Sequence, residues 1–163
     1  FEEEAESEFR MRWESSLTPT IRYNENNILS IEMMSYSFLG GAHGNFFISH
    51  YVYDLRTGEL VALDDVLNKG YKSVITKIAE AEFRKVFEIP KNHSLNDSGF
   101  WFENGVFILN NNFSINQEGI VFQFNPYEIG PYAIGAPAFT IPYAQISSFI
   151  KPDGLLGDRK SVV

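Results

Sequence analysis

The chain has 163 residues, enough for one domain with a hydrophobic core, and its apolar content of 44% is typical of globular proteins. Its net charge of −8 disfavours nucleic-acid binding, because phosphate contacts need clustered Lys and Arg, and the same charge would favour a basic partner. Without cysteine it forms neither disulfides nor thiolate metal sites, and its sequence contains no apolar run long enough to span a membrane.

The N-terminal segment predicts a helix. An apolar residue recurs at every fourth position from Phe1 to Trp13, and glutamates cover the other faces. A strand is expected from Leu17 to Tyr23, and the asparagine-rich residues 24–27 predict a turn after it.

A long apolar segment from Ile28 to Leu39 predicts the next strand. Its alternation changes phase near Met34, which indicates either a β-bulge or a strand covered on both faces. We favour the bulge, because it would re-aim the end that leads into the glycine-rich bend at residues 40–45. A strand rich in Phe, Tyr, Ile and Val is expected from Phe46 to Asp54, with a tight hairpin turn after it.

The clearest helix is expected from Tyr71 to Ile89, where apolar residues form one stripe until Pro90 ends it. Before this helix a short strand at 60–61 and one helical turn at 63–67 are expected, and after it strands at 106–109, 113–115, 120–124 and 139–141, a helix at 142–150 and a flexible tail from Lys151. Together the elements predict an α+β fold, in which a largely antiparallel sheet is covered by two or three helices in a single compact unit.

His43, in the sequence Gly40–Asn45, is the best candidate for chemistry. The glycines permit left-handed backbone geometry, and they place the imidazole where backbone amides are free. The alternative is a tight turn in which the imidazole hydrogen-bonds a nearby carbonyl or carboxylate and holds two loops together. Of the two, the structural turn is favoured.

A second unusual stretch, residues 125–135, combines prolines and glycines with Tyr127, Glu128 and Tyr132. A carboxylate beside a histidine is the minimal general acid–base pair, so Glu128 could orient His43 if the two meet. In the alternative, the tyrosines pack and Glu128 accepts hydrogen bonds from backbone donors.

No metal or cofactor is expected. His43, His50 and His93 share no ligand spacing, and the sequence contains no phosphate loop, dinucleotide fingerprint or nucleophile elbow. His50 is in phase with its apolar neighbours, which indicates a position on the sheet.

Four motifs together resemble a known bacterial module: residues 40–44, 53–59, 118–122 and 126–135. The module is the pair of domains of unknown function numbered 4163 and 3298, and the resemblance runs from about Leu17 to Ile150. Such domains occur in the extracytoplasmic part of the lysozyme-sensing anti-sigma factor and ahead of the catalytic domain of some peptidoglycan deacetylases.

This resemblance implies that a first half, residues 17–69, pairs with a second half, residues 70–150. Residues 1–16 would be a helix left from a longer first domain, and residues 151–163 a flexible tail. It also implies an extracytoplasmic location at the cell envelope, through a lipid or membrane anchor that is not in this chain.

The first hypothesis is a non-catalytic binding or sensing module, whose partner is a basic protein such as c-type lysozyme or a cell-wall glycan. The second is a cell-wall hydrolase or deacetylase with His43 and Glu128 as catalytic residues, and the third is a structural domain. The predicted binding residues are Gly41, His43, Asn45, Tyr127, Glu128 and Tyr132.

Overall fold

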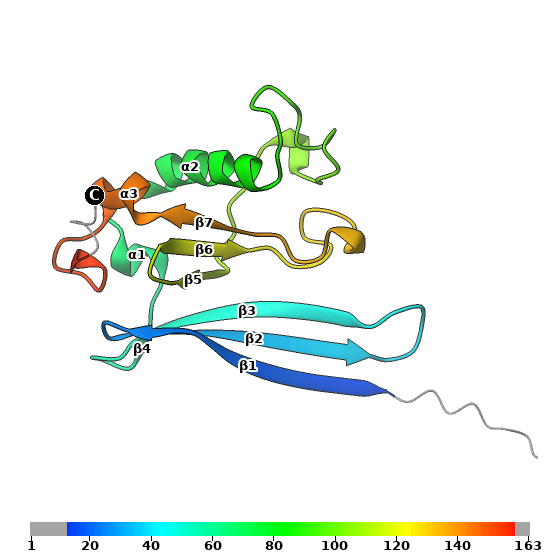
Figure 1. The fold of residues 1–163 in the computed structure, drawn as a ribbon, viewed down its shortest axis with the longest axis horizontal. Coiled ribbons are helices and arrows are strands. Elements are labelled where there is room, and N and C mark those ends of the chain that lie inside the picture. The colour runs from blue at the N-terminus through cyan, green and yellow to red at the C-terminus, as the bar shows by residue number, and fades with distance from the viewer. Residues whose placement is uncertain (1–12, 159–163) are drawn as a thin grey trace, which may run out of the picture.

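The first sheet contains three long strands and one short strand. The computed structural model describes residues 13–158, so the helix predicted for residues 1–13 lies outside the described part apart from its last residue. The strands are β1 (Glu14–Glu25), β2 (Ile28–Phe38), β3 (Asn45–Asp54) and β4 (Glu59–Leu60). They are antiparallel and lie in sequence order across the sheet (Figure 1).

The turns and registers of this sheet follow local sequence. Asn26 and Asn27, between β1 and β2, have φ angles of 53° and 61°, which match the right-handed twist of a hairpin. Pairing of β2 with β3 is uninterrupted, so the bulge predicted in β2 is wrong. The register shift lies in β1 instead, between Ile21 and Tyr23. The phase change arises because β2 has neighbours on both sides and apolar side chains on both faces.

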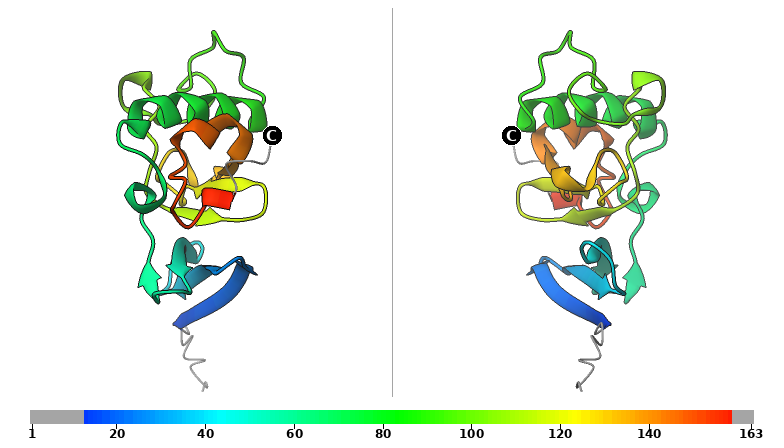
Figure 2. Two further views of the ribbon diagram at one scale, coloured as in Figure 1. Left: turned by 90° about the vertical axis from the view of Figure 1, so that its left-hand side faces the viewer. Right: turned by 90° about the vertical axis from the view of Figure 1, so that its right-hand side faces the viewer.

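The second sheet contains β5 (Phe113–Ile115), β6 (Gly119–Gln123) and β7 (Ala138–Pro142), also in sequence order and antiparallel. Helix α2 (Tyr71–Val86) lies along β7, and the short helices α1 (Leu63–Val66) and α3 (Tyr143–Ile146) flank this sheet (Figure 1). Single 3₁₀ turns occur at Glu103–Gly105, Tyr132–Ile134 and Ser147–Phe149. The predicted α+β class is confirmed, although the strands form two sheets, which the end-on views separate clearly (Figure 2).

The strand predicted at residues 106–109 does not form. Phe107 is buried, whereas Val106 and Ile108 are 60% and 58% exposed, so the segment does alternate. No neighbouring strand pairs with it in the described structure, and an alternating segment without a partner has no ladder to join.

Most of the hydrophobic core lies between α2 and the second sheet. Phe83 of α2 is fully buried, and its ring lies 4.6–6.2 Å from six other phenylalanine rings. Those rings come from the end of α2, the irregular segment 100–107, the end of β6 and β7. One side chain therefore connects α2 with the segment 100–107, the end of β6 and β7.

Helix α2 ends three residues before the predicted Ile89. Glu88 has a φ of 54°, and the Ile89 amide donates to the Arg84 carbonyl while the Glu88 amide donates to the Lys85 carbonyl. This pair of bonds is a Schellman motif, which usually has glycine where Glu88 lies. Backbone hydrogen bonding thus stops the helix before Pro90 does.

The flexible tail predicted from Lys151 needs correction. Leu155 and Leu156 are buried, and the Lys151 amide donates to the Val66 carbonyl at 3.0 Å. Burial of two leucines offsets the entropy cost of ordering this segment, so the chain stays packed through residue 156. Among the described residues, no helix has the length and apolar character needed to cross a bilayer.

Candidate functional site

Two loops at the same end of the molecule form one surface, which we call the loop pair: residues 39–44, between β2 and β3, and residues 125–135, between β6 and β7 (Figure 1). The His43 ring stacks on the Tyr132 ring, with centroids 4.2 Å apart and an interplanar angle of 23°. The Tyr132 hydroxyl donates to the Gly44 carbonyl at 3.0 Å. The two unusual stretches of the sequence are therefore in direct contact.

The histidine has a defined hydrogen-bonding role. His43 Nδ1 lies 2.8 Å from the Gly44 carbonyl, which can only accept, so Nδ1 carries the proton. In the neutral ring Nε2 is then an acceptor, and the Tyr127 hydroxyl lies 3.5 Å from it. His43 remains exposed while it braces the loop, so it combines the structural role with access to a partner.

Glu128 does not serve His43. Its Oε2 accepts from the Asn125 amide and its Oε1 from the Asn110 side chain, each at 2.8 Å. No hydrogen bond or ion pair joins Glu128 to His43 within the described residues. The carboxylate instead fixes the start of the loop and holds Tyr127 at a φ of 67°, which is rare for an aromatic residue.

The glycine loop has little freedom at its C-terminal side. A Cβ at Gly44 would lie 2.3 Å from the Tyr36 hydroxyl, so no larger residue fits without moving that ring. Gly41 has a φ of 114° and open space around it, so backbone conformation rather than packing requires glycine there. Asn45, the last predicted site residue, is exposed and begins β3 opposite Ser37.

Asparagine side chains cover the free edge of β3. Asn112 accepts from the His50 amide at 2.8 Å and donates to the Ile48 carbonyl at 2.8 Å. Asn125 accepts from the Ile48 amide at 2.6 Å and donates to the same carbonyl at 3.1 Å. These amides take the place of a neighbouring strand and join the two sheets. A groove of about 620 Å³ runs beside them, between β3 and Tyr127.

Sequence reasoning treated residues 110–112 only as a turn and missed this role. The available signal was the run of three asparagines. Asparagine carries both a donor and an acceptor in its side chain, as a backbone peptide does, and can therefore complete an open strand edge.

Positive charge is absent from the two sequence segments that contain the loop pair. No Lys or Arg occurs between Arg22 and Arg56, or between Lys91 and Lys151. Among residues 13–158 the cations lie instead on α2 and the segments beside it, on β1, in the turn after β3 at Arg56, and at Lys151. The loop pair therefore carries one carboxylate, that of Glu128, and no cation from its own segments.

A buried polar group lies on the inner face of the first sheet. Arg22 binds the 9%-exposed Glu32 through two hydrogen bonds of 2.9 and 2.7 Å, and His50 is the cross-strand partner of Glu32. Both ring nitrogens of His50 are buried without a hydrogen-bond partner. Burial lowers the pKa of His50, and the charge of Glu32 opposes that shift only in part.

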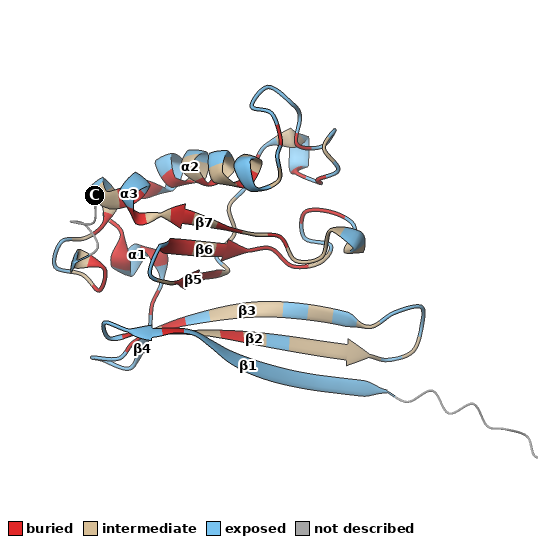
Figure 3. Ribbon diagram, in the orientation of Figure 1, coloured by how far each residue is buried: buried red, intermediate tan, exposed pale blue. Residues whose placement is uncertain are grey.

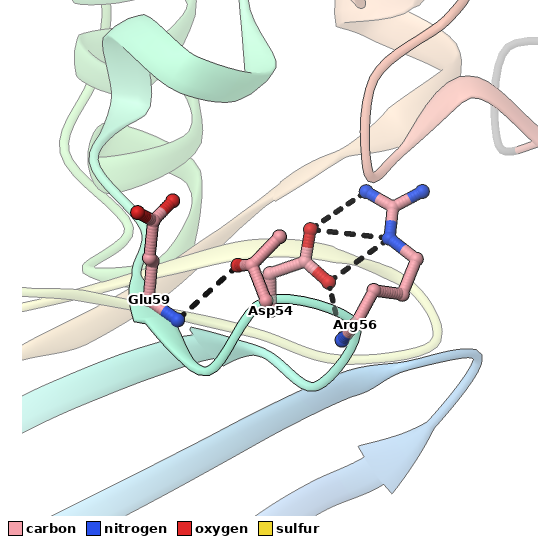
Figure 4. Close-up of polar contacts among 4 residues, drawn as sticks. Asp54, Arg56 and Glu59 are labelled. Atoms are coloured by element: carbon pink, nitrogen blue, oxygen red, sulfur yellow. Dashed lines mark hydrogen bonds and ion pairs between the residues drawn. The ribbon is translucent and has the colours of Figure 1, made fainter.

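The turn after β3 is held by one ion pair. The Asp54 carboxylate accepts from the Arg56 amide, at 2.9 Å, and from its guanidinium, which lowers the pKa of that carboxyl (Figure 4). Gly58 has the positive φ that the hairpin turn requires, as predicted. Within residues 13–158, no group of three His, Asp or Glu side chains could hold a metal ion.

Two family models match the chain. Residues 64–144 match the model described as protein of unknown function (DUF3298), and residues 2–46 match the model described as deacetylase PdaC. No curated protein matches the chain.

Two solved structures share the fold. A DUF3298 family member from Bacteroides fragilis has a TM-score of 0.80 at 22% identity, covering 93% of this chain and 59% of that one. A DUF3298 family protein from Pseudomonas aeruginosa has a TM-score of 0.73 at 24% identity, covering 86% of this chain and 63% of that one. The present chain thus spans about three fifths of the length of each.

Proposed function

Because residues 64–144 match the DUF3298 family model, we propose that the chain is an extracytoplasmic, non-catalytic binding or sensing module of the bacterial cell envelope. The observation that carries this proposal is the loop pair, in which exposed His43 and Tyr127 are held in place by Tyr132 and Glu128. Ordered, exposed aromatic side chains contribute much of the energy of protein interfaces, because little entropy is lost when they bind.

The partner that we propose is a basic protein such as c-type lysozyme. The net charge of −8 attracts a cation at long range, and the loop pair adds no local Lys or Arg to repel it. A cell-wall glycan is the second candidate, because the groove beside Tyr127 is lined by exposed rings and asparagines. Attachment to the membrane would be through an anchor outside this chain.

A hydrolase or deacetylase that uses His43 with Glu128 has less support. Both oxygens of Glu128 already accept hydrogen bonds, from Asn110 and Asn125, and none comes from His43. The partner that orients His43 Nδ1 is the Gly44 carbonyl, so the orienting role that this hypothesis gives to Glu128 is already filled.

Calorimetric titration with c-type lysozyme tests the proposal, at low salt and at about 0.15 M salt. We expect micromolar or tighter binding, weaker at the higher salt, and a loss of about tenfold or more for His43→Ala and Tyr127→Ala. The matched control is His93→Ala, which removes another exposed histidine and leaves the loop pair intact.

Two results would count against the proposal. One is no heat of binding at either salt concentration, which would remove lysozyme and leave a glycan such as a chitin oligomer as the next titrant. The other is equal affinity of the His43, Tyr127 and His93 variants, which would place the contact elsewhere.

A further inference from the structure

The outer face of the first sheet, on the side away from β5, carries no charged residue. Ser30 marks the inner face, because its hydroxyl bonds the backbone of Ile115 in β5. Side chains alternate between the two faces of a strand, so the register places the odd-numbered residues on the opposite, outer face. These are the odd-numbered residues of 15–21 in β1, of 29–37 in β2 and of 45–53 in β3. All of these are uncharged, in a chain of which 21% is charged.

This face is also apolar and exposed. Leu17 and Ile21 are each 64% exposed, Phe47 is 53% exposed and Tyr51 is 39% exposed. Between them a groove of about 320 Å³ is lined by Leu17, Met33 and Tyr53, among others. Exposed apolar patches of this kind, depleted in charge at the centre, mark interaction surfaces.

The edges of the sheet are closed to strand addition. Pro19 lies in the middle of the edge strand β1 and has no amide hydrogen to donate, and the register shift near Ile21 distorts the same edge. At the other edge Asn112 and Asn125 occupy the free groups of β3. A partner must therefore approach the face rather than extend the sheet.

We propose that a second copy of the chain covers this face, so that two four-stranded sheets pack face to face about a two-fold axis. An uncharged face lets two chains of charge −8 approach without burying a carboxylate. The same feature disfavours a basic protein here, since the face offers it no carboxylate to pair with. Sheets that pack in this way interdigitate their side chains about 10 Å apart.

The size of the face sets the expected strength. Nine residues of strand are about 30 Å long and three strands about 14 Å wide, a footprint of about 420 Å² on each copy. This is below the roughly 800 Å² per partner of a standard interface. The dimer should therefore be weak, so its population should depend on protein concentration.

Sedimentation equilibrium over a range of protein concentrations tests the proposal. We expect a reversible monomer–dimer equilibrium that strengthens as salt is added, because salt screens the repulsion between the two acidic copies. Leu17→Glu should weaken dimerisation at least tenfold. The control is Ile108→Glu, which adds the same charge at a 58%-exposed apolar position outside the sheet and should change little.

A monomer at all concentrations overturns the proposal, as does equal dimerisation of the Leu17 and Ile108 variants. A monomer that loses unfolding free energy on Leu17→Glu also overturns it, and shows instead an intramolecular cover of the face. The result of this dimerisation experiment can be distinguished from the result of the lysozyme titration. Lysozyme binding weakens with salt and should be unchanged by Leu17→Glu, so either proposal can fail while the other stands.

Discussion

The two layers of the molecule differ in how much they bury. Between residues 14 and 60 only Tyr23, Ile28 and Val52 are buried hydrophobic residues, and the first nine residues of β1 are all exposed. From residue 61 onward the chain buries an aromatic and aliphatic core around α2 and the second sheet (Figure 3). The second layer can therefore stabilise itself, whereas the first depends on contacts with the second and on whatever covers its outer face.

This difference explains why the candidate site lies where the layers meet. The loop 39–44 belongs to the weakly buried layer, and the loop 125–135 belongs to the well-packed one. Stacking of His43 on Tyr132 fixes the first loop against a rigid support. A binding surface built in this way is ordered before its partner arrives, which lowers the entropy cost of association.

The largest effect should come from the centre of the second layer. We expect Phe83→Ala to lower the free energy of unfolding by about 3–5 kcal/mol, because the cavity would adjoin six other rings. Phe47→Ala, the same change at a 53%-exposed site in the first layer, should cost less than about 1 kcal/mol. Urea denaturation of both variants measures the contrast, and similar losses would show that the first layer is better buried than described here.

The next effect tests the connection between the layers. We expect Asn112→Ala to cost about 1–3 kcal/mol, because it leaves the His50 amide without its acceptor and removes one of the two donors to the Ile48 carbonyl. The neighbouring Asn111→Ala is the control, since Asn111 is exposed and its side chain makes no such bond to β3 among residues 13–158. Thermal unfolding of the two variants measures the difference in stability. If Asn112→Ala unfolds at the same temperature as the unaltered protein, water replaces the side-chain amide without cost, which would contradict this expectation.

A smaller change should stabilise the second layer. Glu88 is exposed, and its φ of 54° is unfavourable for a residue with a Cβ. We expect Glu88→Gly to raise the free energy of unfolding by up to about 1 kcal/mol, because glycine adopts this conformation without strain. Urea denaturation is again the measurement, and a loss of stability would contradict the Schellman assignment.

The smallest effect concerns pH and the first layer. Burial lowers the pKa of His50 in the folded chain, so the unfolded chain binds more protons once the pH falls below the ordinary value of about 6.5. Stability should therefore decrease as the pH is lowered from neutral toward the depressed pKa. We expect His50→Leu to reduce this dependence and His93→Ala to leave it unchanged, as followed by urea denaturation at a series of pH values.

Local patterns predicted those elements whose cause is local. The stripe of α2 follows from burial on one side, β3 follows from its β-branched and aromatic residues, and the positive φ at Gly58 follows from the geometry of a tight turn. The segment 106–109 shows the limit of this reasoning. It alternates as a strand does, but a strand also needs a partner, and periodicity within one segment contains no information about partners.

The site was predictable only in part for a related reason. Gly40–Asn45 and residues 125–135 were recognisable as unusual from their composition, and the structure brings His43 to Tyr127 and Tyr132. Asn112 and Asn125 bond to residues of β3 that are separated from them by 62 and 77 positions in the sequence. No local sequence pattern reports contacts over such a separation. Sequence chemistry allows Glu128 either to orient His43 or to accept from backbone donors, and its partners in the structure are the Asn125 amide and the Asn110 side chain.

Mapping of amide chemical shifts during titration with c-type lysozyme tests whether the loop pair is the binding surface. The largest shift changes should belong to residues 39–44 and 125–135, with little change along α2 or on the outer face of the first sheet. Changes centred on α2, or none at concentrations well above a micromolar dissociation constant, would contradict this expectation.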